Sequence, residues 1–342
     1  MIELFCIGNA MVDVFAQVPP GFCKRFGLDS PLQHISAEKA ASILTALPSD
    51  KVTASGGGAA NTAKIAARLG VSAAFIGASG SDRYADLFEE ELKKAGVFLH
   101  IAKKKSQTGV FISLNCKKPK PDDAAFSTCI VAAPSAALEL EAEDIDEAMF
   151  KNKDNAQEND NPPLPPAKAA AGGVCMVEGF LLDRERLMGR ILELVKKHNL
   201  ALAIDMGTAE IAAEQAKLIQ QKHSFFWDSQ FPLILFLNEA EAEAFANILN
   251  VDWEHFFIGA SKEHSVLITV KLSERGAAVF SGGRVYHVPA EKVIVVESTG
   301  AGDAFAAGFL ATWLRGEGPE QCGREGNSAA VLVLQAPGTA VQ

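Results

Sequence analysis

The stretch from Val293 to Gly316 constrains the fold of this chain more than any other part of the sequence. Its first four residues, Val293 to Val296, are β-branched and apolar, which predicts a strand that is buried on both faces. Gly300 and Gly302 then permit a tight turn, and the apolar residues after them recur at helical spacing until Gly316. The stretch therefore predicts a strand, a glycine turn and a helix in direct succession.

One acidic residue, Asp303, stands at the start of this predicted helix. Backbone N–H groups and the positive end of the helix dipole converge on the turn from Gly300 to Asp303, and both favour a bound anion. A carboxylate there would repel a phosphate, but it is suited to take a proton from a group that attacks the phosphate. The local sequence is equally consistent with an aspartate that only caps the helix.

Composition and charge argue against several classes of function. The chain has 342 residues, of which 48% are hydrophobic and 22% are charged, as is ordinary for a large globular protein. Its net charge of −10 argues against a nucleic-acid partner. Its six cysteines form no C-x-x-C pair, which indicates reduced thiols and a cytoplasmic location. The N-terminal residues lack the basic start of a signal peptide, and no apolar run reaches membrane-spanning length, so we expect no membrane partner.

Strands and helices alternate over most of the sequence. We expect strands at residues 4–7, 73–76, 174–177, 201–204, 233–237 and 266–270, and helices at 36–47, 59–69, 84–95, 184–198, 209–220, 239–249 and 321–334. This alternation predicts a doubly wound, mostly parallel α/β sheet, in which residues at the strand ends lie along one edge. Four polar residues hold such positions: Asp13, Asp205, Asn238 and Asp303.

Two segments depart from this alternation. Residues 97–101, 108–114 and 125–131 predict consecutive strands without helices, as in an antiparallel flap, and residues 141–150 predict a helix. Residues 151–168, KNKDNAQENDNPPLPPAK, are polar and then rich in proline, which indicates a mobile insertion without a chemical role.

A second glycine-rich segment runs from Thr53 to Gly70. Its three consecutive glycines, at positions 56–58, allow the backbone to approach a ligand closely. Asn61 follows in the first turn of an alanine-rich helix, where its amide offers a donor and an acceptor to a polar ligand. The alternatives are a tight turn with an exposed asparagine and, for Asp13, a carboxylate that binds its own turn.

The established nucleotide-binding motifs do not account for these features. The sequence has no G-x-x-x-x-G-K-[ST] loop, no complete G-x-G-x-x-G fingerprint, no protein-kinase signature set and no G-x-S-x-G motif. Asn238 and Glu241 lie three residues apart after a predicted strand. They can hold Mg²⁺ for a triphosphate, or they can cap the helix that follows.

Three motifs resemble those of the PfkB/ribokinase family of carbohydrate and nucleoside kinases. The first is GGGAANTAKIAARLG at residues 56–70, and the second, more specific one is STGAGDAF at residues 298–305. The third, N-x-x-E, matches Asn238 to Glu241, and all three occur in the family's order. The opening GNAMVD, residues 8–13, is most similar to the adenosine-kinase-like branch.

The resemblance implies a fold and a reaction. The fold would be a ribokinase-like three-layer sandwich with a mostly parallel central sheet, a single domain over residues 1–342. A small β lid would be built from strands near residues 10–18 and 97–131, and it would close over the site to exclude water. The reaction would be the ATP-dependent transfer of the γ-phosphoryl group to a hydroxymethyl group of an adenosine-like nucleoside or a sugar.

The resemblance also implies a role for each site residue. Asp303 would be the general base, and the N–H groups of Gly300, Ala301 and Gly302 would stabilise the transferring phosphoryl group. The remaining assignments are acceptor binding by Asp13, Gly57, Gly58 and Asn61, nucleotide binding by Lys271, Gly276, Thr299 and Asn327, and Mg²⁺ binding by Asn238 and Glu241.

The sequence departs from the family pattern in three places, one of which is Ala85, where the family usually has Gly after the aromatic residue. Glu297 and Ser298 stand where the family usually has Asp-Thr, and in some members that Asp helps to bind a monovalent cation, so the need for K⁺ stays open. Many relatives carry an Arg in the third lid strand, where this chain has Ala125-Phe126-Ser127, which leaves the exact acceptor open. The alternative function is a ligand-binding or sensor protein on a catalytically decayed kinase scaffold, although the intact motifs argue against decay. Both a monomer and a homodimer are consistent with the sequence.

Overall fold

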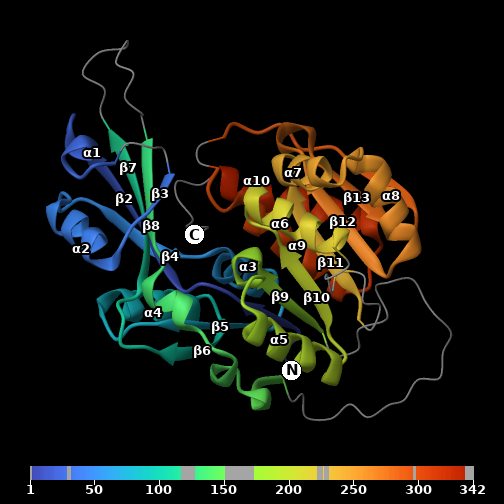
Figure 1. Cartoon of the computed structure of the whole chain (residues 1–342), viewed down its shortest axis with the longest axis horizontal. Coiled ribbons are helices and arrows are strands. Elements are labelled where there is room, and N and C mark those ends of the chain that lie inside the picture. Colours follow the sequence, from blue (N-terminus) through green and yellow to red (C-terminus); the bar gives the residue numbers. More distant parts are fainter. Residues whose placement is uncertain are drawn as a thin grey trace.

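The computed structural model of the chain describes residues 2–28, 32–116, 128–150, 173–221, 226, 231–295 and 298–335. It contains a large sheet between two layers of helices and a second, smaller sheet at one end of the molecule (Figure 1). The insertion expected at residues 151–168 lies outside the described residues, as do Glu297 and the segment Ala125-Phe126-Ser127.

The large sheet is mostly parallel. Among the described residues it has nine strands, in the order β14-β13-β12-β11-β10-β9-β1-β5-β6. The strands from β12 to β6 run parallel, and β13 and β14 add an antiparallel hairpin at one edge. Their bounds are β1 Leu4–Ile7, β5 Ala73–Ser79, β6 Phe98–Lys103, β9 Val174–Glu178, β10 Ala201–Asp205, β11 Leu233–Asn238, β12 Val266–Lys271, β13 Ala277–Ser281 and β14 Arg284–Val288.

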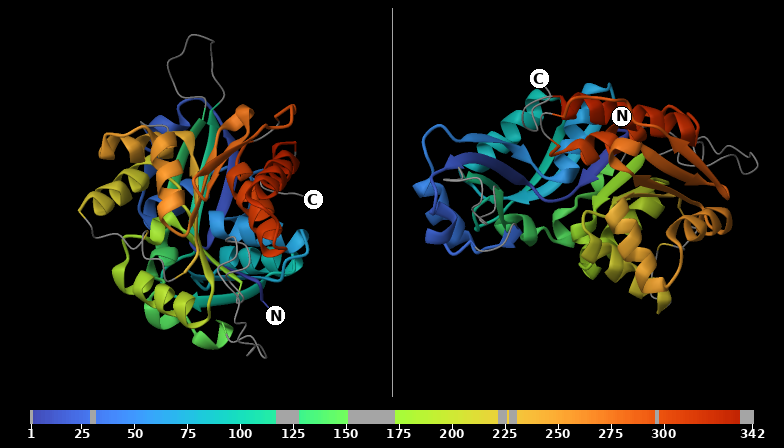
Figure 2. Two further views of the ribbon diagram at one scale, coloured as in Figure 1. Left: turned by 90° about the vertical axis from the view of Figure 1, so that its right-hand side faces the viewer. Right: turned by 90° about the horizontal axis from the view of Figure 1, so that it is seen from above.

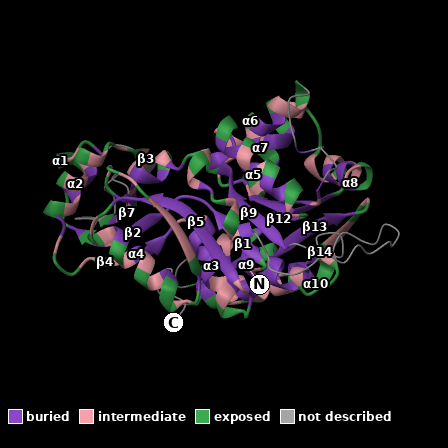
Figure 3. Ribbon diagram, turned by 90° about the horizontal axis from the view of Figure 1, so that it is seen from below, coloured by how far each residue is buried: buried purple, intermediate pink, exposed green. Residues whose placement is uncertain are grey.

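Helices cover both faces of this sheet (Figure 2, Figure 3). Successive side chains of a strand point to opposite faces, so Leu4 and Cys6 of β1 enter one hydrophobic core while Phe5 and Ile7 enter the other. The helices on the first face are α3 Gly58–Arg68, α4 Arg83–Lys94, α9 Ala301–Leu314 and α10 Pro319–Leu334. Those on the second face are α5 Glu185–Lys197, α6 Ala209–Gln220, α7 Glu239–Leu249 and α8 Trp253–Glu263. The predicted three-layer α/β architecture is confirmed. Within the described ranges, no helix is long and apolar enough to cross a membrane.

The second sheet has the strand order β3-β8-β7-β2-β4 within the described residues. The bounds are β2 Met11–Val18, β3 Leu32–His34, β4 Val52–Gly56, β7 Gly109–Cys116 and β8 Thr128–Ala133. The pairing is mixed, because β2 runs parallel to β7 and β3 runs parallel to β8, whereas the other two pairs are antiparallel. The short helices α1, Phe22–Arg25, and α2, Ala37–Ala46, pack on this sheet.

The expectation of an antiparallel flap from residues 97–131 is wrong in two respects. The strand β6 belongs to the large sheet, where Phe98 pairs in parallel with Ala74 of β5. Parallel neighbouring strands need a crossover connection, and α4 supplies it between β5 and β6. The sequence after α4 does not indicate which strand β6 will pair with. The strands β7 and β8 do lie in the second sheet, but that sheet also contains parallel pairs and the two short strands β3 and β4.

The strand expected at residues 293–296 is also wrong for residues 293–295, and Val296 lies outside the described residues. Residues 291–295 form no strand, and Ile294 and Val295 are 86% and 56% exposed. The large sheet ends at β14, and Pro289 directly after it has no N–H group to continue the ladder. A β-branched sequence forms a strand only where a partner strand is present, and the described residues offer none here. The helix expected at 141–150 is replaced by the 3₁₀ turns Ala142–Asp144 and Glu147–Phe150.

Candidate active site

The helix α9 begins at the glycine turn that the sequence singled out. Gly300 is the N-cap residue, with a φ of +82°, a left-handed conformation that favours glycine. Because Gly300 has no side chain, it cannot cover the N–H groups of the first turn as Ser or Asp would. The N–H groups of the first turn are therefore left without a side-chain cap, although no buried strand leads into the turn.

Asp303 lies in the first turn of α9 and faces the first turn of α3. Asn61 Nδ2 donates a hydrogen bond of 2.9 Å to Asp303 Oδ2, although the two residues are 242 positions apart. Thr62 Oγ1 donates one of 3.3 Å to the backbone carbonyl oxygen of Asp303. Gly58 permits this close approach, because a Cβ atom at that position would lie 3.2 Å from Asp303 Oδ1. The two glycine-rich segments thus form one site, and the Asp303 side chain is held by α3 instead of serving as a helix cap.

The electrostatic surroundings of Asp303 favour its protonated form. Burial raises the pKa of Asp303 to about 7, from an ordinary value of 3.8. The hydrogen bond from Asn61 and the charge of Lys271 lower this pKa, whereas the carboxylates of Asp205 and Glu178 raise it. A carboxyl group with a pKa near neutrality can take up and release a proton under physiological conditions.

Glu178 is a site residue that the sequence analysis missed. It ends β9 and is 5% exposed, and it accepts hydrogen bonds from the backbone N–H groups of Asn9, at 3.1 Å, and Ala59, at 2.8 Å. Gly8 leaves room for it, because a Cβ atom there would lie 2.4 Å from Glu178 Oε1. Burial raises the pKa of Glu178 to about 7, although the two N–H donors oppose the shift. Its place directly after a predicted strand was the signal that could have found it.

Two buried amide oxygens near Glu178 and Asp303 lack partners. Asn9 Oδ1 and Asn61 Oδ1 are inaccessible to solvent and accept no hydrogen bond in the described part of the chain. Buried polar atoms are nearly always paired, so each of these two oxygens retains an unused capacity to accept a hydrogen bond. Hydroxyl groups are suitable donors, and the sequence had singled out Asn61 for this reason.

Asp13 reaches the site from the second sheet. It is 5% exposed in β2, and its carboxylate lies against Gly56, where a Cβ atom would come within 2.2 Å of Asp13 Oδ1. The neighbouring Gly57 has a φ of +94°, and a Cβ atom there would lie 2.3 Å from the carbonyl oxygen of Asn9. Glycine is therefore required at both positions, at 56 to leave room for the Asp13 carboxylate and at 57 for the close approach to the backbone of Asn9.

Lys271 stands beside the glycine turn of α9. A Cβ atom on Gly302 would lie 3.3 Å from Lys271 Nζ. This Nζ donates to both carboxylate oxygens of Asp205, at 3.0 and 3.2 Å, across the end of β11, which lies between β10 and β12. Burial alone would lower the pKa of Lys271, but Asp205 and Glu241 outweigh it and raise the pKa. A permanent positive charge therefore faces the anion site.

Asn238 and Glu241 form a complete capping box at the start of α7. Glu241 N donates to Asn238 Oδ1 at 2.9 Å, Asn238 N donates to Glu241 Oε2 at 2.8 Å, and Asn238 Nδ2 donates to Glu241 Oε1 at 2.7 Å. Across the described ranges, no three His, Cys, Asp or Glu side chains are grouped closely enough to hold a metal ion. The oxygen atoms of this pair fit Mg²⁺ only as outer ligands that act through water, as Mg²⁺ often permits.

Three residues of the expected nucleotide site lie around the ends of β14 and α9. Gly276 has a φ of +94°, and a Cβ atom there would lie 2.0 Å from the carbonyl oxygen of Val288. Asn327 Nδ2 donates to that same carbonyl at 3.2 Å and to the carbonyl of Pro289 at 3.1 Å. Gly276 and Asn327 thus meet at the end of β14, while Thr299 directly precedes Gly300. Glycine at 276 and the amide at 327 both have structural roles there.

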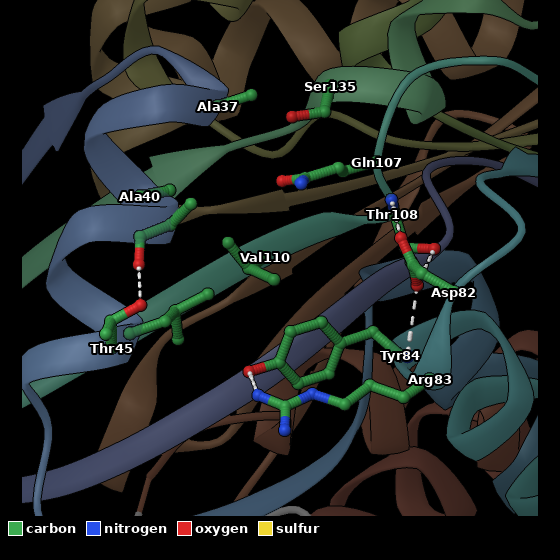
Figure 4. Close-up of a pocket in the computed structure, with 12 residues that line it drawn as sticks. Ala37, Ala40, Thr45, Asp82, Arg83, Tyr84, Gln107, Thr108, Val110 and Ser135 are labelled. Atoms are coloured by element: carbon green, nitrogen blue, oxygen red, sulfur yellow. Dashed lines mark hydrogen bonds between the residues drawn. The ribbon is translucent and has the colours of Figure 1, made fainter.

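The cavity shown in Figure 4 is separate from this site. It has a volume of about 240 Å³ and lies between α2, the start of α4 and the start of β7. Asp82 lines it and accepts hydrogen bonds of 2.8 Å from both the N–H and the Oγ1 of Thr108. This cavity contains none of the residues that surround Asp303.

Comparison with known proteins gives a family and several relatives. The family model described as pfkB family carbohydrate kinase matches residues 35–157 and 229–342. An ATP-dependent ribose-1-phosphate kinase from Halopiger xanaduensis is 28% identical over 280 residues, which cover 81% of this chain and 79% of the relative. A nucleoside kinase from Methanocaldococcus jannaschii is 30% identical over 105 residues, 30% of this chain, so the alignment spans only 33% of that relative.

A solved structure supports the same relationship. The adenosine kinase from Sinorhizobium meliloti superimposes with a TM-score of 0.76 and 25% identity, covering 98% of this chain and 94% of that chain. The resemblance inferred from the three motifs is thereby confirmed. Since its family model matches more than half of the sequence, the chain belongs to the pfkB family of carbohydrate kinases.

Proposed function

We propose that this protein is an ATP-dependent kinase that transfers the γ-phosphoryl group to a hydroxymethyl group of a nucleoside or a sugar. Its family consists of phosphotransferases with an alcohol group as acceptor, for which ATP is the co-substrate, typically with Mg²⁺. The observation that carries the proposal is the carboxyl group of Asp303, held by Asn61 at the mouth of an N-terminal anion site. This arrangement puts a proton acceptor next to the place where a phosphoryl group binds.

Asp303 acts as the general base in this proposal. With a pKa of about 7, it takes the proton of the acceptor hydroxyl as the oxygen attacks the γ-phosphorus. The N–H groups of Gly300, Ala301 and Gly302 stabilise the charge that develops on the phosphoryl oxygens. Lys271, beside Gly302, adds a positive charge to the same side of the site.

The acceptor is bound by polar groups from both sheets. Asp13, Gly57, Gly58 and Asn61 hold its hydroxyl groups, and the unpaired oxygens of Asn9 and Asn61 support this by calling for hydroxyl donors. Phe180, two residues after Glu178, is 44% exposed, and its ring packs against Gly207. An exposed aromatic ring next to a polar site offers a face for a base to stack on, which favours a nucleoside over a simple sugar.

The nucleotide and the metal bind at the strand ends on the other side of Asp303. We assign ATP to Lys271, Gly276, Thr299 and Asn327, and Mg²⁺ to Asn238 and Glu241 through water. When bound, Mg²⁺ supplies positive charge that offsets the β- and γ-phosphates. The second sheet then acts as the lid, with Asp13 as its contact to the acceptor.

The first test is the release of ADP with a panel of acceptors. We expect one of adenosine, other nucleosides, ribose, fructose or a fructose phosphate to support ADP release that EDTA suppresses. The Asp303→Asn variant should lose turnover by about 10³-fold or more, because the proton acceptor is gone, yet it should still bind ATP. A variant that keeps its activity would rule out the assigned base. If no acceptor supports ADP release by the wild type, the protein is a binding protein on a decayed kinase scaffold.

A further inference from the structure

A buried lysine, Lys64, lies beside the acceptor residues and has no role in the function proposed above. It is in α3, three positions after Asn61, and it is only 8% exposed. Its Nζ donates two hydrogen bonds of 2.8 Å, one to the carbonyl oxygen and one to the Oγ of Ser55. Burial of an ammonium group is costly unless neighbouring groups compensate its charge, so the charges around Lys64 need an explanation.

Lys64 holds a strand of the second sheet in place. Ser55 belongs to β4, and its N–H donates a hydrogen bond of 2.7 Å to Oε2 of Glu91 in α4. Two helices that cover the large sheet therefore form hydrogen bonds with Ser55 of β4: α3 through Lys64 and α4 through Glu91. Ser55 pairs with Val12 of β2, and the next residue of β2 is Asp13. These hydrogen bonds hold β4 in place, and through the pairing of β4 with β2 they fix the position of Asp13.

Lys64 also supplies the positive charge near Asp13. Burial raises the pKa of Asp13 to about 6, Lys64 of α3 lowers it, and Glu91 of α4 raises it. For Lys64, burial lowers the pKa and Arg68 adds to that effect, while Glu91, Asp13 and Asp303 act in the opposite direction. Lys64 is therefore a cation whose burial is offset by carboxylates, one of which is the acceptor-binding Asp13.

We propose that Lys64 is a positioning residue for the acceptor: its ammonium group holds Ser55 and so fixes β4 beside Asp13, whose two oxygens then accept hydrogen bonds from acceptor hydroxyls. The role in binding rests on the proposed kinase function, whereas the effect on the ionisation of Asp13 does not. Once protonated, Asp13 would present a donor where an acceptor is needed. The positive charge of Lys64 in α3 thus affects how Asp13 of the second sheet binds the acceptor.

The ionisation of Asp13 can be tested without any substrate. Its carboxyl resonance in the full-length, ¹³C-labelled protein is assigned by its loss in Asp13→Asn and then titrated. Lys64→Met should raise the titration midpoint by about 0.5 pH unit or more, and Glu91→Gln should lower it. Lys94→Met, the same change at a lysine that is 71% exposed in α4, should leave it unchanged. An unchanged midpoint in Lys64→Met, or in Glu91→Gln if Lys64→Met does not fold, would overturn the proposal.

The effect on binding is tested with the acceptor found in the panel. Lys64→Met should raise the acceptor KM by about twofold or more at pH 6 and by less at pH 8, with the ATP KM unchanged. Lys64→Arg, which keeps the charge, should restore most of the acceptor affinity. An equal loss for both substrates, or a loss independent of pH, contradicts the proposal. If no acceptor supports ADP release, the proposed kinase function fails, and the Asp13 titration still decides the role of Lys64.

Discussion

The carboxyl groups of Asp303 and Glu178 are buried where the folded protein disfavours their charged forms. Burial raises the pKa of both to about 7, from 3.8 and 4.5. The folded state therefore holds these protons more tightly than the unfolded chain does. Each group stabilises the fold fully below about pH 4, and this contribution is lost as the pH rises through about 7. The two buried carboxyl groups of the candidate site thus lower the free energy of unfolding at neutral pH, as is common at functional sites.

The Asp303→Asn variant should reveal this effect. The amide removes the charge and keeps an oxygen that can accept the hydrogen bond from Asn61. We expect the stability of the variant relative to wild type to increase by about 1–3 kcal/mol between pH 5 and pH 8. Urea unfolding at both pH values measures the difference. Glu263→Gln, at an exposed position of α8, is the control and should show no such gain. A stability difference that is the same at both pH values would contradict the burial of the Asp303 charge.

Asp303 and Asn61 were predicted from the sequence, whereas Glu178 and Lys64 were missed. The first two follow glycines whose spacing has a physical purpose, the approach of backbone to a ligand. A glutamate after a strand and a lysine in a helix are common at solvated positions, so neither attracts notice. Glu178 becomes a site residue only because Asn9 and Ala59, 169 and 119 positions away, donate to it in the fold.

The N-terminal turn of α9 offers a test with an internal control. Gly300 before the helix and Gly316 after it both have a φ of +82°, and no atom lies within 4 Å of a Cβ built on Gly316. Alanine at either position should cost about 1–2 kcal/mol of stability, because both must adopt the left-handed conformation. Only Gly300→Ala should also lower kcat/KM, by about 10–100-fold, since it displaces the N–H groups of the anion site. Unfolding and kinetic measurements on both variants separate the two effects.

Equal activity in the two alanine variants would contradict the anion site at α9. A loss of activity in Gly316→Ala that matches Gly300→Ala would mean that stability alone controls turnover. The comparison is informative because both substitutions add a methyl group to a left-handed glycine next to the same helix. Gly300 lies close to Asp303, whereas Gly316 lies at the other end of the helix.

The helices α6 and α7 and the strand β1 were predicted to the residue, but two other strand predictions were wrong. The bounds of α6 and α7 agree with the sequence analysis, because Thr208 and the Asn238–Glu241 pair mark their starts through local hydrogen bonds. The β-branched run at 293–296 was misjudged because a strand depends on a partner that the sequence does not identify. The assignment of β6 to the flap was wrong for the same reason, because the sequence does not show that β6 pairs with β5 in the folded chain.

The candidate site joins the two sheets of the molecule. Asp13 belongs to the second sheet, whereas Asn61, Glu178 and Asp303 belong to the large sheet and its helices. The second sheet and the large sheet share one hydrophobic core, and polar contacts add to it, chiefly those of Ser55 with Lys64 and Glu91 and those of Thr108 with Asp82. A ligand that touches both Asp13 and the residues of α3 and α9 would restrain the second sheet relative to the large sheet.

Amide hydrogen exchange of the whole protein can show which segments a bound ligand restrains. A non-hydrolysable ATP analogue alone should slow exchange at the start of α9 and the end of β12, because its phosphates bind there. The acceptor alone should slow exchange in β2 and β4 by about tenfold or more, since it links Asp13 to Asn61. The helix α8, which carries no proposed site residue, is the internal control and should be unchanged by either ligand. Acceptor protection that is confined to α3 and α9, with β2 unaffected, would show that Asp13 does not bind the acceptor and that the second sheet is not a lid.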